Sequence, residues 1–566
     1  MYLVRKDSNC CTIFLLYSLL ISLLIFGSIA LKMDFQKYSF TVPDSLYMLS
    51  PKFWIFLSFM YSLLLVFFFK ARDQFFNALV ITTAYIFIIF PFVQWPNVMG
   101  FDQFLHASTA RLVENGLLAD RSTEINDVYL DYPITSIIQS TFKVVTGFDY
   151  IFGATILALF IKAFTVLILY VMSARIFDKK LSYLVVLLFL ISDFRFNQYY
   201  QFAPQAVAFS LFILLLYAYL KSDRNRSFLM LMLLSYGLIV LAHPYTSFFA
   251  LATLSSVFVI EKVFPKKTRP TLSSTILIFV IILWVFWQLY PALPSFNARS
   301  SYAFTMLTDV SKLQDIFEEA KTVGRAVYST ILLNYQIALQ ISLTIASICG
   351  IIIARNRIPK ILLALLVGFM ILIFQLIITS RPPQLIALDK LFYFGTLPAA
   401  FLAFYSITKM SRTRIIHTFV PVFAIVISAL IPMSFFASNQ FTYMDSIKSW
   451  EMESTSFAAT HIPKAFEKKG TMDSVTSKVY TYYSYDVEKT KPPFGLAYYS
   501  QRNLDDPNDL NINADVVFLT FRQKVDWYYN QGTTPSDWDN LERSSYHDNP
   551  SYNKIYDDYY TRIYVK

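Results

Sequence analysis

The chain has 566 residues and a formal net charge of +10, but only 15% of its residues are charged, while 56% are hydrophobic and 18% aromatic. This composition is too apolar for a soluble protein of this length and is typical of a polytopic α-helical membrane protein. The positive charge does not indicate a nucleic-acid partner, because Lys and Arg gather in short segments between apolar runs.

Apolar runs of spanning or near-spanning length predict about thirteen transmembrane helices over residues 1–436. The runs are Thr12–Leu31, Phe53–Phe69, Phe76–Val93, Tyr150–Met172, Leu181–Phe194, Ala203–Leu220, Phe228–Ala242, Thr246–Val263, Leu272–Tyr290, Val327–Ile353, Ile361–Ile378, Leu391–Ile407 and Ile415–Phe436. The first run follows basic residues and has no small-residue cleavage site at its end, so we interpret it as a retained anchor rather than a signal peptide.

Basic clusters occupy alternate segments between these runs, among them Arg5/Lys6, Lys179/Lys180 and Arg355/Arg357. The positive-inside rule then predicts an integral membrane protein of the cell membrane with a cytoplasmic N-terminus. In this topology the first large loop, residues 94–149, and the whole C-terminal tail are extracytoplasmic.

The composition becomes polar and rich in tyrosine after Phe436, which predicts a soluble extracytoplasmic domain at residues 437–566. Ser454–Lys469 has the spacing of a helix, Asp515–Phe521 that of a buried strand, and Asn553–Lys566 alternates like a hairpin. A small α/β or α+β fold is therefore expected.

Cofactor and metal chemistry have little basis in this sequence. Its three cysteines, Cys10, Cys11 and Cys349, offer neither a disulfide framework nor the spacing of a zinc site. With 13 glycines there is no phosphate-binding loop and no dinucleotide fingerprint. No metal ion and no cofactor is expected.

Among the stretches between apolar runs, only the segment Trp95–Pro133 has the polar residues and spacing that indicate a reaction site. Asp102 and His106 are four residues apart and Ala110 continues the spacing, so a helix that starts near Asp102 would carry the carboxylate and the imidazole on one face, at the membrane surface. An aspartate at a helix start is also a common N-cap, and that structural interpretation stands beside the functional one.

A family resemblance becomes visible in this loop. His106 follows Asp102 by four residues, Asn115-Gly116 ends the short helix, Tyr129-Leu130-Asp131-Tyr132-Pro133 follows, and Thr146-Gly147 precedes the next apolar run. This pattern resembles the GT-C superfamily of membrane glycosyltransferases, which includes protein mannosyltransferase-like and lipid-linked-sugar-dependent enzymes. The helix count, the Pro204-Gln205 pair, the His243-Pro244 helix end and the soluble C-terminal region agree with the resemblance.

The resemblance implies transfer of a sugar from a polyprenyl-phosphate donor to a glycan, lipid or protein acceptor at the extracytoplasmic face. Asp102 matches the first-loop carboxylate that acts as the catalytic base in this family. Many members carry two adjacent acids here, whereas this chain has Asp102-Gln103, and the WWDYG-type signature of oligosaccharyltransferases is absent. That absence argues against transfer of a preassembled oligosaccharide.

Other polar residues are candidates for substrate binding. His106 could orient Asp102 or bind a phosphate, or be an ordinary interfacial residue; Asp131 could bind the acceptor or stabilise its turn. His243 ends a helix on the outer side. Lys162 lies inside an apolar run, where a cation needs a partner or a wet cavity.

Three cations near outer helix ends, Arg195, Arg381 and Lys390, could hold a donor phosphate, or snorkel to lipid headgroups. Two alternatives to a transferase remain at this point: a transporter or flippase for a lipid-linked glycan, and a non-catalytic GT-C-like scaffold. Membrane lipids are expected partners in each case.

Overall fold

The computed structural model describes residues 98–99, 102–114, 130–177, 202–222, 225–263, 272–294, 296–297 and 359–379, a few positions between 182 and 186 and between 394 and 405, and short segments at 446–447, 454–458, 470–471, 516–520, 553–557 and 561–565. The predicted runs that end before Tyr150, and those at Val327–Ile353 and Ile415–Phe436, lie outside the described residues. The total of about thirteen helices and the orientation of the termini therefore stay predictions.

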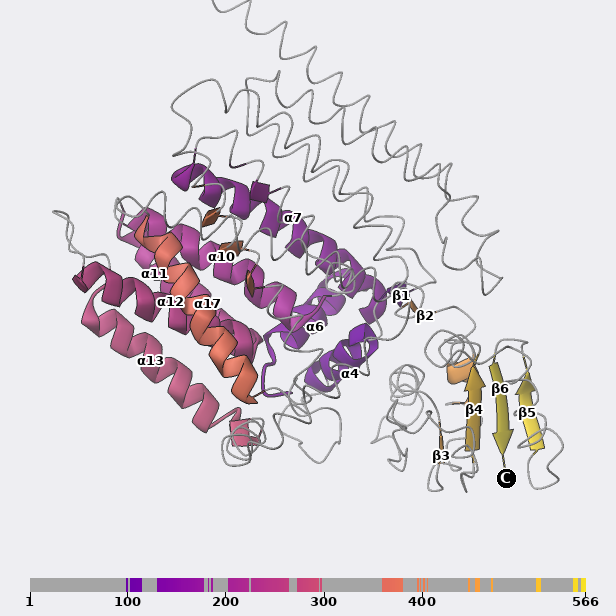
Figure 1. The fold of residues 1–566 in the computed structure, drawn as a ribbon. Helices are drawn as coiled ribbons and strands as arrows, with labels where there is room; N and C mark the ends of the chain where they lie inside the picture. The colour runs from indigo at the N-terminus through magenta and orange to yellow at the C-terminus, as the bar shows by residue number, and fades with distance from the viewer. Residues whose placement is uncertain are drawn as a thin grey trace, which may run out of the picture.

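Six described apolar helices form the membrane part (Figure 1), and all six coincide with predicted runs. They are α7 (Tyr150–Ile176), α10 (Pro204–Ser222), α11 (Ser227–Ala242), α12 (Pro244–Val263), α13 (Ser274–Leu289) and α17 (Lys360–Thr379). Among the described residues, α7, α10 and α12 are long and apolar enough to cross a membrane, and α11, α13 and the stretch Lys360–Ile373 of α17 are shorter apolar helical segments. The protein is an integral membrane protein.

Local sequence explains where these helices begin. Proline is the first residue of α10 and of α12, a position where the missing backbone N–H needs no partner. Asp149 caps α7, because its carboxylate accepts hydrogen bonds from the backbone N–H groups of Ile151 and Phe152 at 3.3 and 3.0 Å.

Aromatic side chains fill the centre of the bundle. Phe212 of α10 packs on Phe249 of α12 with ring centroids 4.8 Å apart, and Phe249 meets Phe394 at 5.2 Å. Helices α12 and α17 approach closely at Gly368, where a Cβ atom would lie 2.5 Å from the Thr253 hydroxyl oxygen and 3.0 Å from the Thr253 Cα. Small residues at such contacts let two membrane helices pack backbone to backbone.

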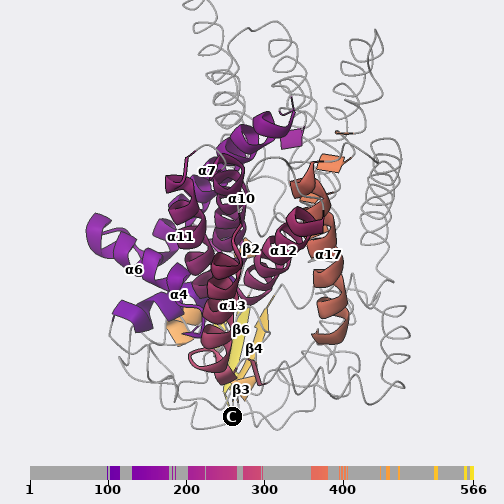
Figure 2. The ribbon, with the colours of Figure 1, turned by 90° about the vertical axis from the view of Figure 1, so that its left-hand side faces the viewer.

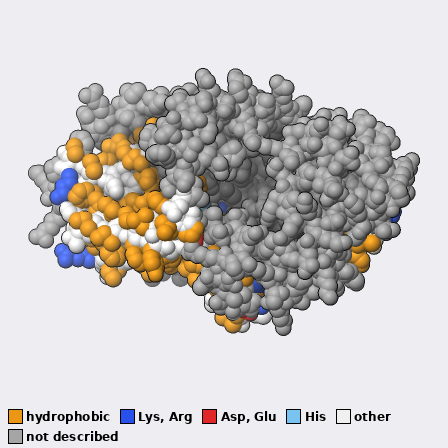
Figure 3. Space-filling view, turned by 90° about the horizontal axis from the view of Figure 1, so that it is seen from below, with side chains coloured by type: hydrophobic (Ala, Val, Ile, Leu, Met, Phe, Trp, Pro, Cys, Tyr) orange, Lys and Arg blue, Asp and Glu red, His pale blue; other side chains and the backbone are white. Residues whose placement is uncertain are grey.

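The outer surface of the bundle is strongly apolar. On α13 the exposed large hydrophobic side chains include Ile278, Phe279, Ile282 and Phe286. Figure 3 shows hydrophobic side chains covering one side of the described surface, with Lys and Arg at its edge. An apolar belt bordered by cations is what a protein in contact with a bilayer presents.

The first large loop contains two helices, α4 (Asp102–Glu114) and α6 (Ile134–Thr146). The sequence predicted α4, but α6 falls in a stretch for which no helix was expected. Gly147, in the left-handed conformation with φ of 73°, ends α6, and its N–H donates to the Lys143 carbonyl at 2.8 Å. Both helices lie against the first half of α7 in the two views of Figures 1 and 2.

The described strands near the C-terminus form a four-stranded mixed sheet in the order β3-β4-β6-β5. It comprises β3 (Gly470–Thr471), β4 (Val516–Thr520), β5 (Asn553–Asp557) and β6 (Thr561–Val565). The strand predicted at Asp515–Phe521 is present as β4. The predicted terminal hairpin is also present, because β5 pairs antiparallel with β6. The extent of a separate soluble domain at residues 437–566 stays a prediction.

A short antiparallel pair connects the C-terminal region to the first loop. Strand β1 (Val98–Met99), three residues before α4, pairs with β2 (Ser446–Ile447) so that Val98 faces Ile447 and Met99 faces Ser446. Segments that share a backbone ladder lie on the same side of the membrane. The pairing therefore supports the expectation that the first loop and the C-terminal region are on one side.

We predict that a V98C/I447C double variant, in a background in which the three native cysteines are replaced by serine, forms a disulfide on mild oxidation. Opposed residues of an antiparallel pair have Cα atoms about 4.5–5.5 Å apart, within the range that a disulfide spans. Proteolysis between the two positions followed by non-reducing electrophoresis reads out the bond. The V98C/S500C variant, whose residues are not paired by β1 and β2, is the control, and equal cross-linking of both variants would contradict the register.

Candidate active site

Helix α4, which begins at Asp102, is enclosed by the surrounding structure. The described residues from Gln103 to Ala110 are all buried, and they include both apolar side chains and polar ones such as His106, Ser108 and Thr109. An amphipathic helix resting on the membrane surface would leave one face exposed. His106 is only 3% exposed and α4 packs against both α6 and α7, so the imidazole faces protein rather than solvent. The position of the Asp102–His106 face at the level of the membrane surface stays a prediction.

Gln103 fastens the first turn of α4 to the first turn of α7. Its amide Nε2 donates to the carbonyl oxygen of Ile151 at 2.9 Å and to the Thr155 hydroxyl oxygen at 3.1 Å. The Thr155 hydroxyl itself donates to the Ile151 carbonyl at 3.1 Å, so both partners accept from Gln103. An amide can supply these two protons, whereas an ionised carboxylate can supply none.

Gln139 of α6 forms a second tie to the same turn, because its Nε2 donates to the Tyr150 carbonyl oxygen at 3.0 Å. The Oε1 atoms of Gln103 and Gln139 are buried and accept no hydrogen bond from any described residue. Both amides are therefore oriented by their donor side. Together they hold α4 and α6 on the start of a membrane-spanning helix, adjacent to the residue expected to be catalytic.

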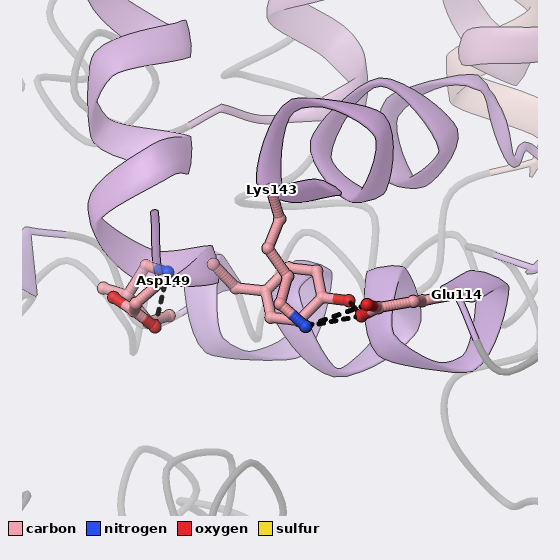
Figure 4. A network of polar contacts seen from close by, with 5 residues as sticks. Glu114, Lys143 and Asp149 are labelled. Carbon is pink, nitrogen blue, oxygen red and sulfur yellow. Dashed lines mark hydrogen bonds and ion pairs between the residues drawn. The ribbon is translucent and has the colours of Figure 1, made fainter. Parts of the chain in front are cut away.

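A cluster of charged and polar side chains joins the C-terminal end of α4 to α6 and α7 (Figure 4). The Lys143 ammonium lies 2.9 and 2.7 Å from the two carboxylate oxygens of Glu114, and the Tyr150 hydroxyl donates to the same carboxylate. Lys143 also sits 4.7 Å from the centroid of the Tyr150 ring. The hydrogen bond from Lys143, followed by that from Tyr150, holds the pKa of Glu114 below its ordinary value of 4.5.

The turn at Asp131 is held by the end of α13. Trp287 donates its indole N–H to the Asp131 backbone carbonyl at 3.2 Å, and the Tyr132 hydroxyl donates to Gln288 Oε1 at 3.0 Å. Asp131 and Tyr132 are 3% and 2% exposed. These contacts hold the backbone of the turn, and the role of the Asp131 carboxylate, in binding an acceptor or in stabilising the turn, stays a prediction.

His243 lies at the sharp junction between α11 and α12. Its Nδ1 accepts a hydrogen bond from the backbone N–H of Thr246 at 3.3 Å and lies 2.9 Å from the Thr246 hydroxyl. The imidazole thus caps α12 in the way an Asp or Asn side chain would. The structure gives His243 this local role, and substrate binding by its Nε2 stays a prediction.

The remaining predicted site residues divide into two groups. Lys162 is buried near the middle of α7. It lies one turn before Thr165, whose hydroxyl contacts the hydroxyl of Ser210 on α10. The side chain of Asp102, and the residues Arg195, Arg381 and Lys390 altogether, lie outside the described structure. Their convergence on a donor phosphate stays a prediction.

Sequence patterns did not identify Gln103, Gln139, Lys143 or Glu114 as functional. In the sequence, Gln103 was noted only because it stands where many members of the resembled superfamily carry a second acid. A signal existed in the helical spacing of Thr135, Gln139 and Ser136, which places polar side chains on one face of α6.

No protein-family model and no curated protein matches this sequence. Among solved structures, the chain is similar to the Archaeoglobus fulgidus oligosaccharyltransferase in complex with Zn and sulfate, with 12% identity over 87% of this chain and 73% of that chain and a TM-score of 0.49. It is also similar to ArnT from Cupriavidus metallidurans bound to undecaprenyl phosphate, with 12% identity over 86% of this chain and 97% of that chain and a TM-score of 0.38.

We predict that Q103E destabilises the protein at neutral pH, because the introduced carboxylate would face two oxygen acceptors. Leaving such buried groups without a donor costs about 1–3 kcal/mol. The loss should shrink as the pH falls, because burial raises the pKa of the introduced carboxyl and its protonated form regains one donor. Thermal unfolding in detergent measures the effect.

T155V is the matched control for Q103E. It removes one acceptor but leaves the bond from Gln103 to the Ile151 carbonyl, so its effect should be the smaller one and should not depend on pH. An equal loss of stability in the two variants would contradict the assignment of Gln103 as an obligatory donor.

A second prediction concerns E114Q. The side chains of Lys143 and Glu114 are 35% and 32% exposed, so the ion pair should contribute only about 0.2–1 kcal/mol. Because the folded-state pKa of Glu114 is lowered, this stability is present above the ordinary carboxyl pKa and is lost as the pH falls through the lowered value.

The unfolding temperatures of wild type and E114Q should therefore differ at neutral pH and converge in acid. Adding K143M to E114Q should cause little further loss at neutral pH, since the pair is already broken. A difference that persists unchanged in acid would show that the ionised carboxylate is not what stabilises this corner.

Proposed function

We propose that the protein is a membrane glycosyltransferase that transfers a sugar from a polyprenyl-phosphate donor to an acceptor hydroxyl at the extracytoplasmic face, with Asp102 as the general base. The observation that carries the proposal is the position of Asp102. It is the first residue of a buried helix that Gln103 ties to the start of a membrane-spanning helix.

The chemistry needs one carboxylate and a leaving group that is already anionic. The acceptor hydroxyl oxygen attacks the anomeric carbon, its proton passes to the Asp102 carboxylate, and the bond between that carbon and the phosphate oxygen breaks. The polyprenyl phosphate leaves with the bonding electron pair. A positioned base contributes typically about 10²–10⁴-fold to such a step.

Rigid positioning is the property that α4 brings to this reaction. A base must lie within hydrogen-bond reach of the proton that it removes, and small displacements are costly in rate. The tie from Gln103 fixes the residue next to Asp102. The side chains of Phe104 and Ala107 are fully buried, so α4 is also packed against its surroundings. The start of a helix also favours an ionised carboxylate, because the backbone N–H groups there are unpaired.

A donor with a lipid tail has to reach this site from the bilayer. The first turn of α7, to which α4 is attached, belongs to a 27-residue helix that is long and apolar enough to cross a membrane, so Asp102 would lie close to the level of lipid headgroups. A phosphate at that level is within reach of cations near outer helix ends. Arg195, Arg381 and Lys390 remain the candidates for this contact, with His106, Lys162 and His243 as further polar groups.

We predict that D102N loses sugar transfer by about 10²–10⁴-fold while its folding and donor binding are preserved. Asparagine keeps the size and the N-capping ability of aspartate but cannot take up a proton. The assay is consumption of polyprenyl-phosphate sugars, offered as a panel, by purified protein in lipid. Thermal unfolding and a donor-binding measurement verify that the variant is intact.

D131N is the control for this experiment. Asp131 is buried at a turn and its backbone is held by Trp287, so the change should affect stability or acceptor affinity and spare the chemical step. Transfer by D102N at the wild-type rate would assign Asp102 to helix capping only. Failure of the wild-type protein to consume any donor would favour the transporter or scaffold alternative.

A further inference from the structure

Helix α6 has its polar side inward and its apolar side outward. The buried side chains are Thr135, Ser136, Gln139 and Ser140, all of which are polar. On the opposite side, Ile137, Val144 and Val145 are 38%, 67% and 78% exposed. In water this arrangement would be unfavourable, because a surface helix normally buries its apolar face and exposes its polar one.

The exposed apolar face of α6 continues into the exposed face of α7. Phe148, in the turn between the two helices, packs edge-on against Phe152 of α7 with ring centroids 5.1 Å apart, and lies 6.2 Å from Phe142 of α6. Further along α7, Phe160 and Phe164 are also exposed. One apolar surface therefore runs from α6 along a helix that is itself long and apolar enough to cross the membrane.

The length of α7 places α6 at the edge of the bilayer rather than inside it. Twenty-seven helical residues extend about 40 Å, roughly 10 Å more than the hydrocarbon core. The excess can be taken up by tilt or by extension into the headgroup region. α6 leaves the side of the bundle at this end in Figure 2, and its polar contacts with α4 and α7 are on the side away from its apolar face.

Charged groups mark the boundary of the apolar face. Lys143, which pairs with Glu114, is the only charged residue of α6 and lies toward its polar side, while Asp149 caps α7 directly after the turn. Both charged side chains therefore lie off the apolar face.

We propose that α6 is an interfacial anchor whose apolar face, formed by Ile137, Val144 and Val145, inserts between the acyl chains of the leaflet on the first-loop side. Its occupant is lipid, because the face is continuous with the lipid-facing surface of α7 and carries no charge. Helices of this kind lie about 5–10 Å deep at the boundary of headgroups and acyl chains. The polar face of α6 then contacts α4, so the insertion of α6 sets the depth of the Asp102 helix relative to the bilayer.

The test uses spin labels on single cysteines introduced at Val145 and, separately, at Ile137, in the full-length protein with its three native cysteines replaced by serine. The labelled protein is reconstituted into phosphatidylcholine and phosphatidylglycerol vesicles. Accessibility to oxygen, which concentrates in the acyl region, is compared with accessibility to a water-soluble nickel chelate. F160C on α7 is the control for a lipid-exposed position, and K554C on β5 is the control for a water-exposed one.

We expect the oxygen-to-nickel ratio at both α6 positions to approach that of F160C and to exceed that of K554C several-fold. A ratio equal to that of K554C would overturn the proposal, since the face would then lie in water. Labels shielded from both reagents would overturn it too, because another part of the chain or a second copy would cover the face. Sugar transfer is not part of the readout, so the result is independent of the proposed activity. Using two positions guards against one label that disturbs folding.

Discussion

The hydrogen bonds from the Gln103 amide to Ile151 and Thr155 are the constraint on which the candidate site depends. Helix α7 is anchored in the bundle by its contacts with α10, and α4 packs against both α6 and α7. A buried neutral hydrogen bond contributes a net of about 0.5–1.5 kcal/mol, which is small beside the burial of a helix. Its importance is geometric, because it fixes the rotation of α4 at the residue next to Asp102, where apolar packing alone would tolerate several orientations.

The described structure has two kinds of interior, and their border coincides with the expected edge of the membrane. Within the bundle, Phe212, Phe249 and Phe394 pack ring against ring. Between α4, α6 and α7 the interior also contains glutamines bonded to backbone carbonyls of another helix, beside apolar side chains such as Phe104. Such polar contacts are directional and specify one arrangement, whereas apolar packing is more permissive. The layer that carries the candidate base is therefore held by directional interactions between helices.

Sequence patterns predicted the six described membrane helices well, because apolar length and proline at helix starts are local properties, as Pro204 and Pro244 illustrate. The helix at Asp102 and the terminal hairpin were also predicted from local patterns, the four-residue spacing of a helix and the alternation of a strand. Helix α6 was missed because its thirteen residues are too few to span a membrane and resemble a loop, although Pro133 and Gly147 flank it. The partners of Gln103 could not be predicted, since Ile151 and Thr155 lie 48 and 52 residues away and accept through a backbone carbonyl and a hydroxyl.

The departure of Asp102-Gln103 from a pair of adjacent acids has a physical explanation in this packing. An acid at position 103 would point at the Ile151 carbonyl and at a hydroxyl oxygen that already donates its proton elsewhere, so it would be repelled unless it stayed protonated. The amide is therefore required by the neighbours that this chain places there. If Asp102 is the base, it acts as the one carboxylate of this pair, and Gln103 positions the helix that carries it. One carboxylate is enough for a transferase with an anionic leaving group, because the departing phosphate needs no acid to protonate it.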